Sequence, residues 1–273
     1  MRDLARRHDV RPSKALGQHF LVDPNLVRAI VTDAGVQPGD RVLEVGAGFG
    51  SITLELARAG AQVLAVEFDR QLVPGLREVV DGLGNVRVEE ADAMRADWDG
   101  LLDGGEWRLV SNLPYNISVP LLVELLEAVP AIVRYVVMVQ REVGERLVAG
   151  PGDDAYGTVS LRIAYRADAQ LLRRVPADVF WPRPNVDSVL VRLDPRPPEV
   201  AVDPAALFRV VDVAFAERRK TMSNAVRRLG WPRERAERTL ADAGIDPSTR
   251  PEQVGLEPFA ELTEALLARG WRP

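Results

Sequence analysis

The first half of the chain alternates short apolar runs with amphipathic segments, and this pattern constrains the fold more than any other feature. The apolar runs have the length of strands, and residues at helical spacing separate several of them. The predicted strands are residues 41–45, 62–66, 86–88, 109–110 and 133–139. The predicted helices between them are residues 52–58, 72–80 and 121–129. Strands that alternate with helices favour an α/β fold with a doubly wound, mostly parallel sheet.

The pattern changes after about residue 150. Residues 156–164 could form a helix or a strand, whereas residues 171–175 and 189–193 are typical of a strand pair that closes the sheet. The proline-rich segment that starts at Asp194 breaks regular structure, and helical spacing resumes at Pro204. We therefore predict a first domain over residues 1–196 and a small all-α C-terminal domain over residues 199–273.

Composition excludes several classes of site. The chain has no cysteine, so it forms no disulfide, Fe–S cluster or zinc–thiolate site. Its two histidines, His8 and His19, are too few for a histidine-based metal site. No apolar stretch approaches the roughly 20 residues of a membrane helix, and no signal-peptide core follows the basic start. We expect a soluble, cytoplasmic protein.

The formal net charge is −5, but the charges are segregated. Residues 1–20 carry five basic against two acidic side chains, and residues 217–238 carry eight against three. The local electrostatic field matters more than the net charge for binding a polyanion. The same two basic segments could also be solvated helix faces.

A glycine-rich turn follows the first predicted strand, with Gly46, Gly48 and Gly50 at the spacing G-x-G-x-G. Glycines let a backbone take positive φ and approach a ligand closely. A dinucleotide fingerprint needs glycine at its sixth position, where this chain has Ser51.

Two carboxylates follow at the ends of the next predicted strands. Glu67 can accept hydrogen bonds from both ribose hydroxyls of a nucleoside. Asp92 stands where an adenine ring would lie, or else caps a turn. Without a pyrophosphate-type fingerprint, S-adenosylmethionine is favoured over NAD, because it has no phosphate and its positively charged sulfur suits acidic neighbours.

The tetrapeptide Asn112-Leu113-Pro114-Tyr115 follows the fourth predicted strand. Ligands of open α/β sheets bind outside the carboxyl ends of the strands, so a second substrate would lie here beside the first. Asn112 and the Leu113 carbonyl offer acceptors, Pro114 stiffens the turn, and Tyr115 offers a stacking face. These groups suit the exocyclic amino group of a purine. Phe180 could cover the other face of the base, or pack under its loop.

Several motifs together resemble the KsgA family of ribosomal RNA adenine dimethyltransferases. The motifs are residues 14–21, the glycine turn, and residues 112–115, 140–146, 156–157, 180–188 and 214–221. The resemblance spans nearly the whole chain. It implies a Rossmann-like, S-adenosylmethionine-dependent methyltransferase domain and a helical C-terminal domain. The implied reaction transfers two methyl groups to N6 of each of two adjacent adenines near the 3′ end of small-subunit rRNA.

The resemblance also implies roles for individual residues. The matching cofactor contacts are His19, Leu21, Gly46, Gly48, Glu67, Asp92 and Asn112, and the acceptor site is Asn112, Leu113, Pro114, Tyr115 and Phe180. The expected rRNA contacts are Lys14, Arg218, Arg219 and Lys220. The implied partner is the 30S particle, bound by a monomer that needs no metal or membrane. Four positions depart from the family pattern, with His19 for a frequent asparagine, Ala47 for a proline, and Met222-Ser223 for a leucine and a basic residue.

Other functions stay open at this point. A macrolide-resistance methyltransferase dimethylates one adenine of large-subunit rRNA on a similar scaffold. A non-catalytic ribosome-assembly or transcription factor could share the fold. A DNA adenine methyltransferase is disfavoured by Asn112, where those enzymes generally carry an acidic residue. An NAD oxidoreductase is disfavoured by Ser51.

Overall fold

The computed structural model describes residues 1–13 and 16–273, and within it the chain forms two compact units. The first comprises residues 1–144 and 168–195, and the second comprises residues 145–167 and 196–273. Residues 145–167 thus group with the C-terminal helices. The division at residues 196–199 stays a prediction about the chain's domains.

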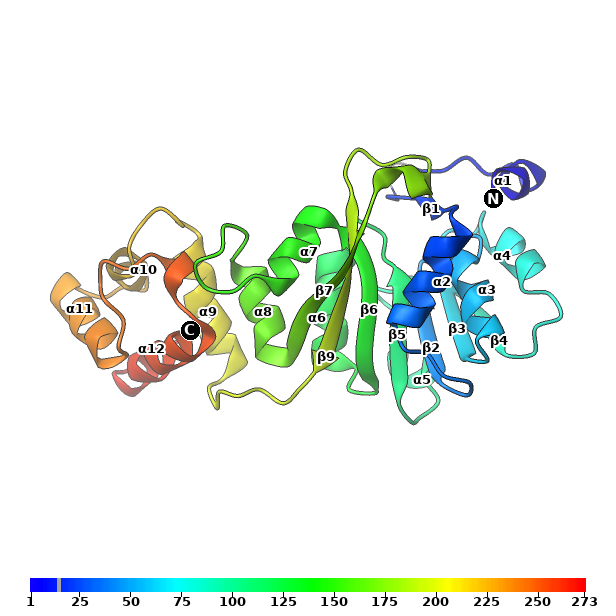
Figure 1. Ribbon diagram of the computed structural model, residues 1–273. Coiled ribbons are helices and arrows are strands. Elements are labelled where there is room, and N and C mark those ends of the chain that lie inside the picture. The colour runs from blue at the N-terminus through cyan, green and yellow to red at the C-terminus, as the bar shows by residue number, and fades with distance from the viewer. Residues whose placement is uncertain (14–15) are drawn as a thin grey trace. The chain divides into compact units, whose positions relative to one another are not determined.

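A seven-stranded sheet, ordered β4-β3-β2-β5-β6-β9-β7, forms the centre of the first unit (Figure 1). The strands are β2 (Arg41–Val45), β3 (Gln62–Glu67), β4 (Val86–Glu90), β5 (Trp107–Asn112), β6 (Ile132–Gln140), β7 (Ala167–Val175) and β9 (Ser188–Pro195). Strands β2 to β6 pair in parallel, and β9 pairs antiparallel with β6. The predicted α/β class is confirmed, and the two late strands close the sheet as predicted.

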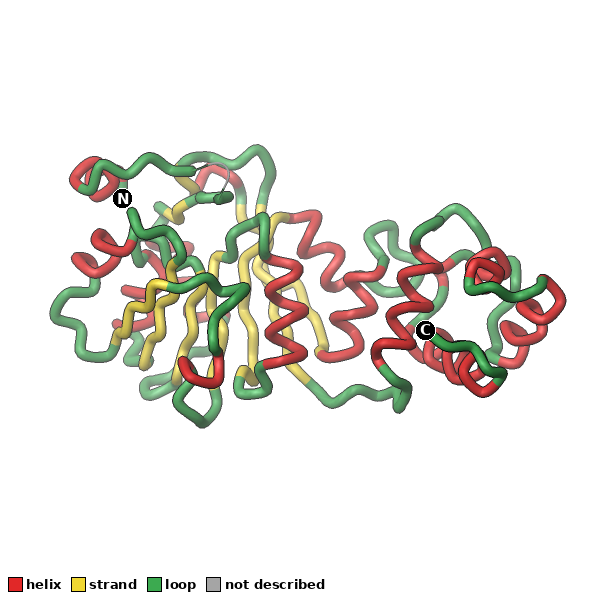
Figure 2. Tube along the Cα trace, turned by 180° about the vertical axis from the view of Figure 1, so that it is seen from behind, coloured by secondary structure: helices red, strands yellow, loops and turns green. Residues whose placement is uncertain are grey.

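Helices cover both faces of this sheet. They are α2 (Pro24–Asp33), α3 (Ser51–Arg58), α4 (Val73–Val79), α5 (Trp98–Leu101) and α6 (Ser118–Ala128). Helix α7 (Arg141–Val148) follows β6 and spans the boundary between the two units. In Figure 1, α2 and α3 lie in front of the sheet, and the view from behind in Figure 2 brings α6 forward. Helix α2 begins as its sequence indicates, because the Asp23 side chain accepts from the backbone N–H groups of Asn25 and Leu26. Helix α6 buries Leu121, Leu122 and Leu125.

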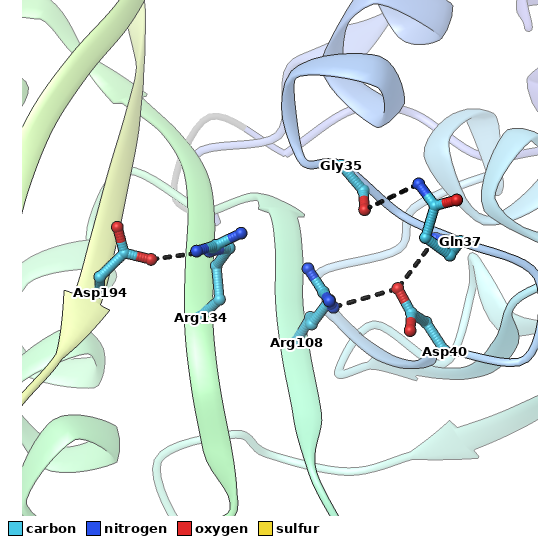
Figure 3. A network of polar contacts seen from close by, with 6 residues as sticks. All are labelled: Gly35, Gln37, Asp40, Arg108, Arg134 and Asp194. Atoms are coloured by element: carbon cyan, nitrogen blue, oxygen red, sulfur yellow. Dashed lines mark hydrogen bonds and ion pairs between the residues drawn. The ribbon is translucent and has the colours of Figure 1, made fainter.

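The amino ends of the strands carry ion pairs (Figure 3). Arg108 Nε on β5 lies 3.1 Å from Asp40 Oδ2, which also accepts from the Gln37 N–H at 2.9 Å. Arg134 Nε on β6 lies 2.7 Å from Asp194 Oδ1 on β9. These ion pairs lie at the edge of the sheet opposite the glycine turn and residues 112–115.

The N-terminal segment adds a small sheet and a helix. Strand β1 (Phe20–Leu21) pairs antiparallel with β8 (Phe180–Trp181). Helix α1 (Arg2–Arg7) buries Leu4 and Ala5 in a cluster with Phe20, Phe49 and Leu72. His8 Nε2 contacts Glu78 Oε2 at 2.7 Å. These contacts hold residues far apart in sequence against the carboxyl ends of the strands.

The second unit has its own helical core. Its α-helices include α8 (Thr158–Arg166), α9 (Pro204–Phe215), α10 (Met222–Arg228), α11 (Arg233–Asp242) and α12 (Leu256–Ala268). Helix α9 packs on α12, and Leu207, Val211, Phe259 and Leu262 belong to the same buried cluster. The open choice for residues 156–164 is resolved as helix.

Candidate functional site

A cavity of about 270 Å³ lies at the carboxyl ends of the parallel strands. The turns after β2, β3, β4 and β5 line it, together with residues 16–21 of the N-terminal segment. It brings together most of the predicted site residues, which are His19, Leu21, Gly46, Gly48, Glu67, Asp92, Asn112, Leu113, Pro114 and Tyr115. Lys14 lies outside the described residues.

The glycine turn approaches protein neighbours very closely. Gly46 has φ +73° and Gly48 has φ +58°. A Cβ atom at Gly46 would come within 3.0 Å of the Pro114 ring, and one at Gly48 within 3.0 Å of the Phe20 ring. The two glycines thus let the turn pack closely between the acceptor tetrapeptide, residues 112–115, and the N-terminal segment.

Glu67 is held by the backbone on both sides. Its Oε2 accepts from the Gly48 N–H at 2.7 Å, and its Oε1 accepts from the Asp69 N–H at 2.8 Å. Burial raises the pKa of Glu67, while these two hydrogen bonds lower it. Each carboxylate oxygen keeps a further lone pair, which a ligand hydroxyl can use.

Asp92 caps its turn and also lines the cavity. Its Oδ1 accepts from the Met94 N–H at 3.0 Å. Asp92 thus does cap a turn, as one of the two predicted alternatives had it. Its Oδ2 lies 3.8 Å from Arg95 Nε at the surface.

Glu44 is a cavity residue that the sequence analysis did not single out. It interrupts the apolar strand β2, is 2% exposed, and accepts a hydrogen bond from Thr53 Oγ1 at 2.5 Å. Burial raises the pKa of Glu44 to about 8, the Thr53 hydrogen bond opposes the shift, and the negative charge of Glu67 adds to it. An acidic residue inside a buried strand was the signal that could have found it.

The charged side chains of the cavity have one sign. Among its described lining residues they are the carboxylates of Glu67, Asp69 and Asp92, with no lysine or arginine. Glu44 is mostly uncharged near neutral pH, because its pKa is raised to about 8. Such a lining attracts a cation and disfavours a phosphate. The cavity residues therefore fit a positively charged nucleoside such as S-adenosylmethionine better than a dinucleotide.

Asn112 holds a buried acceptor without a partner. Its Nδ2 donates to the His19 carbonyl oxygen at 2.9 Å, and because a carbonyl only accepts, this contact fixes which end of the amide is nitrogen. Within the described chain, Oδ1 is buried and accepts no hydrogen bond. Leaving such an atom unpaired is costly, which indicates that a ligand donor completes it.

Tyr115 is fixed beside Asn112. Its hydroxyl lies 2.7 Å from Ser188 Oγ on β9, and its ring stacks on His19 with centroids 5.3 Å apart and planes at 30°. Burial raises the pKa of the Tyr115 phenol, and the Ser188 contact opposes that shift. Pro114 and the buried Leu113 connect the two residues.

Phe180 is placed differently from the other predicted acceptor residues. It is 3% exposed, pairs with Leu21 in the β1–β8 sheet, and packs in the core instead of lining the cavity. The packing alternative is realised here, so stacking of Phe180 on a base stays a prediction that requires its ring to move. By contrast, Phe68 lines the cavity with 58% of its surface exposed, and sequence reasoning missed this aromatic residue next to Glu67.

The second unit carries the other predicted cations. Arg218 contacts the Asp154 carbonyl at 3.2 Å and Glu252 at 3.5 Å. Several neighbouring arginines are also paired, namely Arg228 with Glu217, Arg233 with Glu237 and Arg238 with Glu234. Arg219, Lys220 and Arg227 are exposed and form no ion pair with any described residue.

No helix in the described residues is long and apolar enough to cross a membrane. The same residues contain no cluster of three His, Cys, Asp or Glu side chains that could hold a metal ion.

The sequence profile of the family described as "Ribosomal RNA adenine dimethylase" matches residues 10–266. The chain belongs to the ribosomal RNA adenine dimethylase family. It is 43% identical to the "Ribosomal RNA small subunit methyltransferase A" of Moorella thermoacetica, over 96% of this chain and 95% of that protein. A protein of the same name from Kineococcus radiotolerans is 45% identical over 96% of this chain and 88% of its own length.

Solved structures agree with this dimethylase fold. A dimethyladenosine transferase from Plasmodium falciparum has a TM-score of 0.79 over 93% of this chain and 99% of its own, and its 23% identity shows the fold alone. The 23S rRNA methyltransferase ErmE has a TM-score of 0.69 at 27% identity, over 90% of this chain and 99% of its own. The chain is thus a Rossmann-like methyltransferase of the rRNA-modifying class.

Proposed function

We propose that this dimethylase transfers methyl groups from S-adenosylmethionine to N6 of two adjacent adenines in the 3′-terminal hairpin of small-subunit rRNA, giving N6,N6-dimethyladenine. The observation that carries the proposal is the unpaired Oδ1 of Asn112, a residue that lines the acidic cavity together with Tyr115. The small-subunit relatives support the choice of substrate. We further propose that it acts in the cytoplasm as a monomer on the 30S particle.

The cavity residues divide the work of holding the methyl donor. Glu67 and Asp92 have spare carboxylate lone pairs for ribose and adenine groups, and the exposed face of Phe68 can pack against the adenine ring. Gly46, Gly48, Leu21 and His19 line the same cavity. When bound, S-adenosylmethionine supplies an electrophilic methyl group on a positively charged sulfur, which the surrounding carboxyl groups stabilise.

Asn112 and Tyr115 would position the acceptor. A target adenine must leave its stack, at a cost of a few kcal/mol, and Tyr115 repays part of that cost by stacking on it. Asn112 Oδ1 and the Leu113 carbonyl accept hydrogen bonds from its amino group. These bonds favour a pyramidal nitrogen whose lone pair faces the donor. Catalysis then comes mainly from positioning, and no side chain needs to act as a strong base, because the nitrogen becomes acidic as it gains the methyl group.

The test uses the purified protein with labelled S-adenosylmethionine and methylation-deficient small subunits, followed by mapping of the modified nucleotides. We expect dimethyladenine at two adjacent positions near the 3′ end, and no label on 23S rRNA. Label confined to 23S rRNA would support the macrolide-resistance alternative. No label on either substrate would support a non-catalytic factor.

A further inference from the structure

We propose that His19 is a positioning residue of the acceptor site, which orients Asn112 through its backbone carbonyl and Tyr115 through its imidazole ring. The inference deepens the proposed function and rests on it. It assigns to this side chain a role toward the acceptor base that is separate from any contact with the methyl donor.

The His19 ring is locked on one side by the backbone. Its Nδ1 lies 2.7 Å from the carbonyl oxygen of Pro182. Because that oxygen only accepts, Nδ1 must carry a proton and donate, and this contact fixes the orientation of the ring. Phe20 follows His19, and Trp181 precedes Pro182. Because Phe20 pairs with Trp181 in the β1–β8 sheet, His19 and Pro182 come close together.

The locked ring supports one face of Tyr115. The two rings stack with centroids 5.3 Å apart, and the Tyr115 hydroxyl is held at 2.7 Å by Ser188, which is fully buried. Tyr115 is thus fixed at its hydroxyl end and on one face. A flipped base can stack only on the opposite face while His19 keeps its place.

The backbone of the same residue orients the second recognition group. The His19 carbonyl receives the Asn112 Nδ2 at 2.9 Å, which leaves Oδ1 as the free acceptor. Gly17, two residues earlier, has φ +64°, and a Cβ there would lie 3.3 Å from the Tyr115 backbone nitrogen. Residues 17–19 therefore press against the acceptor tetrapeptide at several points, so displacement of His19 would loosen both Asn112 and Tyr115.

Three substitutions separate the ring from its hydrogen bond. His19→Phe keeps a stacking ring and loses the Nδ1 donor. His19→Asn keeps a donor at the same number of bonds from Cα and loses the ring. His19→Ala loses both, and each variant keeps the backbone carbonyl that holds Asn112.

The experiment measures kcat and KM for small subunits, and the Kd for S-adenosylmethionine, in wild type and the three variants. We expect His19→Ala to lower kcat about tenfold or more, as a loosened acceptor requires, with a donor Kd within about threefold of wild type. His19→Phe and His19→Asn should each recover part of that loss. An unchanged kcat in His19→Ala, or a donor Kd that worsens as much as kcat falls, would overturn the inference.

Coupling to Tyr115 distinguishes positioning from a general loss of structure. In the Tyr115→Ala background, His19→Ala should cost less kcat than it does in wild type, because its effect passes through Tyr115. Equal costs in the two backgrounds would contradict the assigned role. A second experiment needs no methyl donor. It follows the fluorescence of a hairpin RNA that carries 2-aminopurine at the target position. His19→Ala should reduce the fluorescence change that protein binding causes, and an unaltered fluorescence change would count against the role of His19. Failure of wild type to methylate small subunits would instead overturn the proposed function.

Discussion

Asn112 and His19, which are 93 residues apart, meet where the Asn112 Nδ2 donates to the His19 carbonyl oxygen at 2.9 Å. This contact sets the orientation of the amide and leaves Oδ1 buried without a partner among the described residues. The site therefore holds an acceptor atom without a donor, and we propose that the amino group of the target adenine supplies it.

Replacing Asn112 separates acceptor recognition from donor binding. Asn112→Ala should cut kcat by about a hundredfold, because a misplaced acceptor costs that much, while the Kd for S-adenosylmethionine changes little. Asn112→Asp should be similarly slow, since a carboxylate cannot donate to the His19 carbonyl. Steady-state kinetics and calorimetric titration measure the two effects. Equal losses in kcat and donor affinity would contradict the assigned role of Asn112.

Tyr115 separates stacking from anchoring. Tyr115→Phe keeps the ring and loses only the Ser188 contact, so it should lower the free energy of unfolding by about 1 kcal/mol and leave most activity. Tyr115→Ala loses the stacking face, worth about 1–3 kcal/mol per base, and should lower kcat/KM by roughly five- to 150-fold. Chemical denaturation and kinetics on small subunits test both. A Tyr115→Phe variant as inactive as Tyr115→Ala would mean that the hydroxyl, not the ring face, matters.

The exposed cations of the second unit predict a salt-dependent affinity for RNA. Changing Arg219, Lys220 and Arg227 to glutamine should make the fall of log K for RNA binding with log salt shallower. The magnitude of the slope should drop by roughly 2–3, at about 0.7–0.9 per phosphate contact. A matched control changes Arg228, Arg233 and Arg238 to glutamine. It removes the same number of positive charges, but from arginines that have carboxylate partners. Filter binding of small-subunit rRNA over a salt series measures the slopes. Equal changes in the two variants would exclude a specific role for the unpaired set.

Glu44 predicts the pH dependence of stability. Its pKa is raised from the usual 4.5 to about 8 in the folded protein, so between these values the folded state holds a proton that the unfolded state releases. Stability should therefore fall as pH rises through this window, by up to about tenfold in the unfolding constant per pH unit. Glu44→Gln cannot ionise and should flatten the fall. Denaturation at several pH values tests this, and parallel curves for the two proteins would rule the shift out. Glu67, whose pKa is also raised, contributes with the same sign in both proteins.

Much of the fold follows from local sequence. Strand β2 has the predicted bounds, and Asp23 caps α2 as predicted, because a short apolar run and a helix cap are both encoded by neighbouring residues. The turns after the strands likewise place Glu67 and Asn112 in one cavity, since carboxyl ends of parallel strands meet at one edge of a sheet.

The remaining features depend on contacts between distant segments. The β1–β8 sheet joins strands of two residues each, too short to leave a periodic signal, and it buries Phe180. An acidic residue within an apolar strand marks Glu44 in the local sequence, but its raised pKa depends on burial and on Thr53 and Glu67 of other elements. The free Oδ1 of Asn112 likewise depends on where the His19 carbonyl lies.

A structure of the protein with S-adenosylmethionine and an adenine-containing RNA tests the placement of the two substrates most directly. The donor methyl should point at the adenine N6, with the reacting atoms roughly 3–3.5 Å apart, while Asn112 Oδ1 accepts from that amino group and Tyr115 stacks on the ring. A donor methyl directed away from Asn112, or an adenine bound without contact to either residue, would contradict the proposed acceptor site.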